Sequence, residues 1–302
     1  MQNKLPISAI VMTFNEERNL TECLDSIKDH VDEIIVVDSF STDRTIEIAR
    51  KYTDRVYQHE FINQAKQFIW TVSTINISNE WILRIDADER WTDKGFEELN
   101  KLIKLDCYDG IYVKMQIFFM GRFIRHGAFY PNYFLRVYKK SKGTMEDRFM
   151  DEHIQVSGET VMSEIDVTEK NWDRMACLTD FISKHNKYAS REAAEYLANH
   201  YDLRKMDSIA SASGNKTEKK RWLKENFYYR LPKFFRALIY WKYRYFIKLG
   251  FLDGIEGFIF HFLQGFWYRF LVDAKIYQVE RYAKDENLDM KSAVKKVLDI
   301  DI

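Results

Sequence analysis

Two aspartates, Asp86 and Asp88, are the residues whose types and spacing most clearly suggest chemistry. They follow an apolar run, residues 81–85, of the kind that forms a buried strand, and ligands of a parallel α/β sheet gather outside the carboxyl ends of its strands. Side chains two positions apart on extended backbone point the same way, so both carboxylates are expected on one side. Hard oxygen ligands suit Mg²⁺ or Mn²⁺, and phosphate oxygens of a substrate usually complete the coordination shell of such an ion. An acidic pair at a strand end can also be a solvated turn or a helix cap.

The preceding residues predict the elements that would position this pair. Residues 6–14 are an apolar run of buried-strand type, and residues 33–38 are a second, β-branched run that ends in Asp38. A helical pattern follows each run, and residues 55–57 suggest a third, shorter strand. This alternation predicts an α/β sheet with right-handed crossovers and one composite site along its carboxyl edge.

Three short motifs give the chain a resemblance to a known family. They are residues 13–16 (Thr-Phe-Asn-Glu), 37–43 (Val-Asp-Ser-Phe-Ser-Thr-Asp) and 85–89 (Ile-Asp-Ala-Asp-Glu). In this order they resemble glycosyltransferase family 2, and residues 61–70 and 251–257 add to the match. Within that family the chain is similar to bacterial enzymes that build the sugars of lipopolysaccharide core, O-antigen or capsule. The resemblance implies the GT-A fold with a Rossmann-like mixed sheet, a nucleotide-sugar donor, a divalent cation and an inverting transfer.

The resemblance also implies roles for the residues at the strand ends. Asp88 would meet the ion, Mn²⁺ or Mg²⁺, directly, and Asp86 would contact the ribose or a metal-bound water. Asp38 would accept a hydrogen bond from a base N–H, which the resemblance assigns to the uracil of a UDP-sugar. Thr13 and Glu16 match positions that line the base and the ribose.

Asn63 and Gln67 form a second candidate group for the donor. They lie one helical turn apart and therefore share a helix face. That face either points at the donor or is an ordinary polar helix surface.

The general base is expected to be a carboxylate from a later segment, opposite the diphosphate. Related enzymes carry an acidic doublet or His-Glu there, which makes Glu152 the base and Asp151 its neighbour. Adjacent residues on a strand face opposite sides, so only one of the two can act. His153 is a rival base or a hydrogen-bonded packing residue. His126 and Arg136 are expected to flank the acceptor, unless His126 is only a surface loop residue.

Composition is consistent with one catalytic domain and an appendage. The 302 residues carry 46 basic and 46 acidic side chains, so the net charge supports no argument about partners. The three cysteines, Cys23, Cys107 and Cys177, are scattered without a Cys-x-x-Cys pattern, which argues against a disulfide framework and favours a reducing cytosol. Cys23 lies on an apolar helix face and is expected in the core. No signal peptide is expected, because the N-terminus lacks a basic segment before a long apolar stretch.

The C-terminal region has an uneven charge distribution. Between Lys219 and Lys248, ten lysines and arginines stand against one acid, Glu225, with aromatic residues interleaved. No stretch reaches the ~18–20 apolar residues that a spanning helix needs. Basic and aromatic residues mixed on helices suit the surface of an anionic membrane leaflet. The alternatives are a helical subdomain that packs its rings internally, or a single-stranded nucleic-acid site, and we expect no nucleic-acid partner.

These patterns predict a GT-A catalytic domain over residues 1–214 and a helical, membrane-associating region over residues 215–302, divided by a small-residue linker at 208–215. The predicted function is metal-dependent, inverting transfer from a UDP-sugar to a lipid-linked or lipopolysaccharide glycan, by a cytoplasmic protein at the inner face of the cytoplasmic membrane. Two other classes remain. One is a sugar-nucleotide pyrophosphorylase, although its Gly-rich, basic phosphate loop is missing near the N-terminus. The other is a non-catalytic, membrane-bound nucleotide-binding scaffold.

Overall fold

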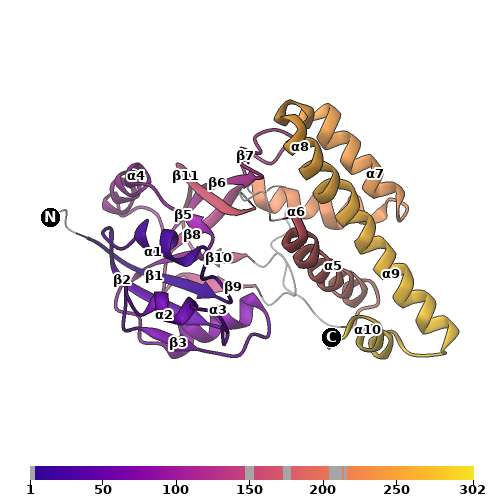
Figure 1. Ribbon diagram of the computed structural model, residues 1–302, viewed down its shortest axis with the longest axis horizontal. Helices are drawn as coiled ribbons and strands as arrows, with labels where there is room; N and C mark the ends of the chain where they lie inside the picture. The colour runs from indigo at the N-terminus through magenta and orange to yellow at the C-terminus, as the bar shows by residue number, and fades with distance from the viewer. Residues whose placement is uncertain (1–3, 147–152, 173–177, 204–212, 214–215) are drawn as a thin grey trace. The chain divides into compact units, whose positions relative to one another are not determined.

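The structure is a computed structural model that describes residues 4–146, 153–172, 178–203, 213 and 216–302. Asp151, Glu152 and Cys177 lie outside the described residues. The chain divides into two compact units (Figure 1). The described residues of the first unit are 4–123, 130–145 and 153–172, and those of the second are 124–129, 146, 178–203, 213 and 216–302.

The first unit is built on one mixed β-sheet. Its strands follow the order β3-β2-β1-β4-β8-β6-β11-β5, with β7 paired to β6. The first four in that order are parallel, whereas β8 runs antiparallel to both β4 and β6. The strands are β1 (Leu5–Thr13), β2 (Val31–Asp38), β3 (Val56–Gln58), β4 (Trp81–Asp86), β5 (Glu89–Arg90), β6 (Gly110–Phe119), β7 (Arg122–Phe123), β8 (Tyr133–Lys139) and β11 (Thr160–Trp172). A separate pair is formed by β9 (Gly143–Met145) and β10 (Ile154–Val156). The predicted mixed α/β fold class is confirmed.

Helices cover both faces of this sheet. They are α1 (Leu20–Asp25), α2 (Thr45–Ala49), α3 (Gln64–Thr74) and α4 (Asp93–Lys104). Residues of α1, α2 and α4 join one buried cluster, which contains Val11 and Leu83, whereas α3 contributes to the cluster that contains Ile10 and Ile82. Successive strand residues point to opposite faces, so the two clusters lie on opposite sides. Parallel strands covered in this way need nearly continuous apolar residues, which explains the runs seen in the sequence.

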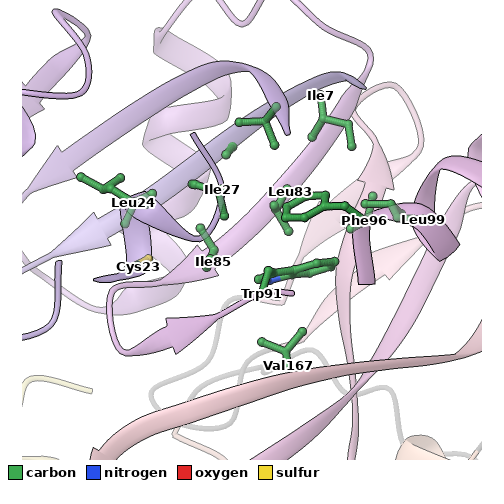
Figure 2. Close-up of a cluster of buried hydrophobic side chains, with 14 of the residues drawn as sticks. Ile7, Cys23, Leu24, Ile27, Leu83, Ile85, Trp91, Phe96, Leu99 and Val167 are labelled. Carbon is green, nitrogen blue, oxygen red and sulfur yellow. The ribbon is translucent and has the colours of Figure 1, made fainter. Parts of the chain in front are cut away.

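The first of these clusters lies beneath the strand end that carries Asp86. Figure 2 shows Cys23, Leu24 and Ile85 in it, together with Trp91. Cys23 is completely buried, as predicted for a core residue. It is a free thiol, as is the exposed Cys107.

The second unit is helical and has its own core. Its elements are α5 (Leu178–His200), α6 (Lys216–Asn226), η2 (Tyr228–Arg230), α7 (Phe235–Lys242), η3 (Tyr243–Ile247), η4 (Gly250–Asp253), α8 (Gly254–Phe260), η5 (His261–Trp267), α9 (Tyr268–Asp285) and α10 (Met290–Leu298). Apolar residues of α5, α9 and α10 share one buried cluster. The helical region expected at the C-terminus is therefore present. The contact-defined units differ from the predicted domains in assigning α5 to the helical unit, and the predicted boundary after residue 214 stays a prediction.

Several basic residues of this region are internal rather than on its surface. Arg221, Arg236 and Arg244 are each at most 5% exposed. Arg236 forms a buried ion pair with Asp273 and lies over the rings of three tyrosines, Tyr196, Tyr228 and Tyr229. Burying such a charge requires a partner of this kind. The predicted basic surface is therefore smaller than the sequence suggested.

Large apolar side chains, in contrast, are exposed on the same helices in two rows. The first row lies along α7 and η3 at helical spacing, Phe235, Ile239, Tyr243 and Phe246, and the second lies along α8 and η5, Ile255, Phe258 and Phe262. Exposure reaches 68% at Phe235 and 74% at Ile255. In the part of the chain that the structure describes, no helix combines the length and apolar character needed to cross a membrane.

Asp253 holds residues 124–129 within the second unit. Its carboxylate accepts the backbone N–H groups of Arg125 at 3.3 Å and His126 at 2.9 Å, and ring N–H groups of His126 at 2.6 Å and His261 at 3.3 Å. Burial alone would raise the pKa of Asp253, but the hydrogen bonds from His261 and His126 lower it. His126 is therefore committed to Asp253. Removing the chain after residue 214 would leave residues 124–129 without these partners.

Gly127 is the tightest point of this arrangement, and Gly127→Ala should destabilise the second unit. Its φ is +68°, and an added Cβ would lie 2.2 Å from the His261 ring. Backbone strain and overlap together should cost about 2–4 kcal/mol, measured by thermal unfolding. Gly121→Ala is the control, because its φ is +82° but nothing lies within 4 Å of the new Cβ. Equal losses of thermal stability in the two variants would show that the His261 ring moves away from the new Cβ without a measurable cost.

Candidate functional site

The carboxyl ends of β1, β2 and β4 lie at one edge of the sheet. Thr13 pairs with Asp38 across β1 and β2, and Met12 pairs with Asp86 across β1 and β4. Because these strands are adjacent and parallel, the register brings the three predicted site residues to the same edge.

Asp38 is completely buried and organises the loop that follows β2. Its Oδ1 accepts a hydrogen bond from the Thr13 hydroxyl at 3.0 Å, and its Oδ2 accepts one from the backbone N–H of Ser41 at 2.8 Å. The Ser41 hydroxyl donates to the same carboxylate. A carboxylate offers about four acceptor positions, so one further donor, such as a base N–H, can be accommodated. That donor reaches Asp38 only if the loop opens.

The loops after β1 and β2 are bonded to each other. The Asn15 N–H donates to Ser41 Oγ and the Glu16 N–H donates to Thr45 Oγ1, each at 2.8 Å. Glu16 is half-buried, and its carboxylate also accepts from Asn19 at 2.8 Å. The two loops therefore form one connected wall. Glu16 stabilises this wall through its own hydrogen bonds, in addition to its predicted contact with the ribose.

Phe40 is a strained residue in this wall. Its φ is +57°, a left-handed conformation that is unfavourable for a bulky side chain, yet the ring is 56% exposed. Phe14, at the end of β1, is 58% exposed. Strain and exposure of this kind concentrate at binding sites, so the two rings are candidates for contact with a planar ligand.

The chain turns between the two aspartates instead of staying extended. Strand β4 ends at Asp86, a turn contains Ala87 and Asp88, and β5 begins at Glu89. The turn is required because β5 pairs with β11 rather than continuing β4, and the Lys170 N–H of β11 donates to the Asp88 carbonyl at 2.9 Å. Burial still alternates, with Asp86 and Asp88 half-buried and the residues that follow each of them buried.

The Asp86 carboxylate accepts hydrogen bonds from two other elements, and a second arginine lies close to it on its own strand. Arg136 Nη2 of β8 donates to its Oδ2 at 2.9 Å, and Gln64 Nε2 of α3 donates to its Oδ1 at 3.3 Å. Arg84 Nη2 lies 3.9 Å from Oδ1. Gln64 and Arg84 were not predicted as site residues, and Arg136 was expected near the acceptor.

Glu89 and Arg136 form a buried ion pair beside Asp86. Their side chains are 2% and 8% exposed. Burial raises the pKa of the Glu89 carboxyl. Burial alone would lower the pKa of the Arg136 guanidinium, but the negative charges of Glu89 and Asp86 raise it above its usual value. The pair is ionic, because arginine keeps its proton in proteins and a cation at contact favours the carboxylate. Glu89 lies inside the acidic motif, which is the one sequence signal that pointed to it.

Asn63 and Gln67 are both buried, so the alternative of an exposed polar helix surface is wrong. Asn63 is the N-cap of α3, its side chain accepting the Lys66 N–H at 2.8 Å. Gln67 Nε2 donates to Ser39 Oγ at 2.8 Å, which ties the helix to the loop after β2. The Gln67 amide oxygen is buried without a hydrogen-bond partner among the described residues, so it can accept a bond from a ligand.

The donor set at this edge fits an ion that takes few protein ligands. The described residues contain no group of three or more His, Cys, Asp or Glu side chains placed to hold a metal. Mg²⁺ and similar ions are usually held by one or two carboxylates and complete their shell with phosphate oxygens and water. Asp88 and Asp86 match that requirement and do not match an all-protein metal cage.

The predicted base cannot be placed in the structure. Glu152 and Asp151 fall outside the described residues, and His153 is half-buried immediately after them. Their roles therefore stay predictions.

Comparison with known proteins identifies the family. The sequence model described as "Glycosyl transferase family 2" matches residues 8–231. The lipopolysaccharide core biosynthesis glycosyltransferase LpsC of Rhizobium meliloti is 27% identical over 300 residues, 95% of this chain and 97% of LpsC. An uncharacterised glycosyltransferase of Rickettsia typhi is 27% identical over 274 residues, 89% of this chain and 86% of that protein. This chain belongs to glycosyltransferase family 2 and is a glycosyltransferase, which sets the pyrophosphorylase class aside.

Solved structures resemble the chain over a smaller part. The glucosyl-3-phosphoglycerate synthase of Mycobacterium tuberculosis, solved with Mg²⁺ and UDP, is 22% identical and aligns over 37% of this chain and 43% of its own, with a TM-score of 0.31. The two structures share too little for residue roles to be carried from one to the other.

Proposed function

We propose that the protein transfers a sugar, with inversion, from a UDP-sugar to a lipid-linked or lipopolysaccharide glycan, using Mn²⁺ or Mg²⁺. The observation that carries the proposal is the convergence of Thr13, Asp38 and Asp86 at the carboxyl edge of three parallel strands, in a member of family 2. Such an edge offers acceptors for a base and a ribose beside carboxylates suited to a cation.

The nucleoside would bind against the wall formed by the loops after β1 and β2. Asp38 has one acceptor position left for a base N–H, and Gln67 has a buried amide oxygen to offer. Thr13 would act through Asp38, which its hydroxyl fixes. Phe14 and Phe40 present exposed rings on which a base can stack.

The diphosphate would lie over the turn after β4. Asp88, with Asp86 beside it, would hold the ion, which when bound neutralises charge on the departing diphosphate and orients it. Asp86 and Glu16 are acceptors in reach of the same edge and would take the ribose hydroxyls. This division leaves Asp88 as the principal metal ligand.

Transfer with inversion is a single displacement at the anomeric carbon. The acceptor oxygen forms its bond to that carbon as the bond to the diphosphate oxygen breaks, and the acceptor hydroxyl loses its proton to a base on the acceptor side. Glu152 is our choice for that base, with Asp151 next to it. A positioned proton acceptor typically contributes ~10²–10⁴-fold to the rate.

The two apolar rows of the second unit support a lipid-linked acceptor. We infer that they enter the headgroup region of an anionic leaflet, since rows of exposed large apolar side chains mark a membrane or protein partner. Lys242 and Lys248 are exposed on the same stretch and match anionic headgroups. LpsC, similar along its whole length, is named for lipopolysaccharide core biosynthesis. The site would then work on the cytoplasmic face, where the donor arrives from solution.

The metal requirement can be tested at Asp88. Asp88→Ala should reduce transfer by ~10²-fold or more and abolish the effect of Mn²⁺ on UDP affinity measured by calorimetry, because the ion loses its principal protein ligand. Asp93→Ala is the control, since that carboxylate is 89% exposed and pairs only with His30 in the described structure. Full activity of the wild-type enzyme after treatment with EDTA would refute metal dependence.

The base assignment can be tested by nearly isosteric changes. Glu152→Gln should lower kcat by roughly 10²-fold or more with little change in UDP affinity, because it removes a proton acceptor and no donor contact. Asp151→Asn should have a milder effect. The reverse ranking would assign the base to Asp151, and two mild effects would favour His153.

Membrane binding can be tested on the two apolar rows. The triple variant Phe235→Ser, Ile239→Ser and Ile255→Ser should lose about 100-fold or more in affinity for anionic vesicles, because each inserted apolar side chain contributes up to ~1.5–3 kcal/mol. Its thermal stability should stay near that of the wild type, since all three side chains are more than half exposed.

Leu105→Ser is the matched control, an apolar side chain 62% exposed on the first unit. High salt should weaken vesicle binding only in part, because insertion of the apolar side chains does not depend on charge and three of the arginines are buried. A wild-type protein that does not sediment with anionic vesicles at all would contradict the membrane proposal and favour a soluble acceptor.

A further inference from the structure

Arg136 reaches the Asp86 carboxylate from a strand far away in the sequence. Strand β8 runs antiparallel to β4, with Leu83 opposite Val137, so Arg136 follows alongside the last residues of β4. Its guanidinium lies 5.5 Å from the centre of the Phe134 ring. An arginine placed in this way arrives with its fork already oriented.

A single nitrogen of Arg136 donates hydrogen bonds to two carboxylates, one partly exposed and one buried. Nη2 donates both to Asp86 Oδ2, at 2.9 Å, and to Glu89 Oε1. The Asp86 side chain is 28% exposed, whereas that of Glu89 is 2% exposed. Glu89 is therefore placed to anchor the guanidinium from the interior, and Asp86 is the end of the network that a ligand can reach.

We propose that Arg136 is a positioning residue for the donor nucleotide, which fixes the Asp86 carboxylate at the carboxyl edge while Glu89 fixes Arg136. The proposal rests on the proposed function only in that Asp86 faces the nucleotide. The hydrogen bonds from Arg136 to Oδ2 and from Gln64 to Oδ1 hold the Asp86 carboxylate in a defined orientation. Preorganisation of this kind lowers the cost of binding, since no side chain has to be ordered when the ligand arrives.

Neutralisation is the second consequence of the arrangement. Asp86, Asp88 and Glu89 would place three negative charges where a diphosphate has to bind, and Arg84 and Arg136 offset part of that charge before any ion is present. A purely structural ion pair would need Glu89 and Arg136 alone. The bond to the more exposed Asp86 is what links the pair to the ligand.

Arg136→Lys separates the two functions of the side chain. Lysine keeps the charge but presents a point charge in place of the planar fork, so it cannot hold both carboxylates in the same geometry. We expect the affinity for UDP, measured with Mn²⁺ by calorimetry and for weak variants by NMR, to fall about 10- to 100-fold. If the wild type prefers another nucleoside diphosphate in a panel of UDP, GDP, CDP, ADP and dTDP, that nucleotide becomes the probe.

The decisive measurement is a double-mutant cycle with Asp86→Asn. If Arg136 acts through Asp86, Arg136→Lys should cost less than about 3-fold in the Asp86→Asn background, since the contact it positions is already gone. Glu89→Gln should show the same dependence on Asp86, and it provides the test if Arg136→Lys fails to fold. Loss of stability alone would not depend on Asp86 in this way.

Arg55→Lys is the matched control. Arg55 pairs with the buried Glu33, but Glu33 lies opposite Ser8, four residues before the position on β1 that faces Asp86. This variant should lower the thermal stability and leave nucleotide affinity unchanged. If Arg136→Lys lowers nucleotide affinity equally with and without Asp86, or does not lower it at all, this proposal is overturned. The proposed function, which rests on nucleotide binding by the wild type, would not be affected. A wild-type protein that binds none of the nucleotides would overturn both this proposal and the proposed function.

Discussion

The register of β1 with its two parallel neighbours is the constraint on which the site depends. On one side β1 aligns Thr13 with Asp38, and on the other it aligns Met12 with Asp86. A slip of one residue would exchange the two faces of the strand and move apolar side chains out of both clusters. The strand is buried on both faces, so the cost of such a slip is high and the edge is fixed by the core beneath it.

This edge collects negative charge where we propose that a diphosphate binds, and the structure shows how that conflict is reduced. Asp38 is satisfied by local hydroxyl and N–H donors and does not need a cation. Asp86 is paired with Arg136, whose second carboxylate, Glu89, is buried. Asp38 and Asp86 are thus committed or neutralised in advance, and an added ion is the partner that we propose for Asp88.

Much of the first unit could be predicted from local pattern, because buried parallel strands leave continuous apolar runs and end in polar residues. β1, β2 and β3 and the burial of Cys23 follow from that pattern. Arg136 was assigned to the acceptor because its position depends on β8 inserting antiparallel beside β4, a pairing between segments about fifty residues apart that neither segment encodes alone. The turn at Asp88 was missed for the same reason, since it is imposed by β11.

The C-terminal region shows the limit of counting charges in a sequence. A composition count does not tell buried from exposed basic side chains, but three of the arginines there are buried, and two of them, Arg236 and Arg244, are internal partners for carbonyls, rings or a carboxylate. Arg236 pairs with Asp273, and Arg244 donates to the Gly127 carbonyl at 2.7 Å and lies over the Phe129 ring. Among the described residues of 219–270, most of the exposed side chains are apolar. Any attraction of this unit to a membrane therefore depends more on insertion of Phe235, Ile239 and Ile255 than on charge, and it should persist at ionic strengths that screen a purely electrostatic contact.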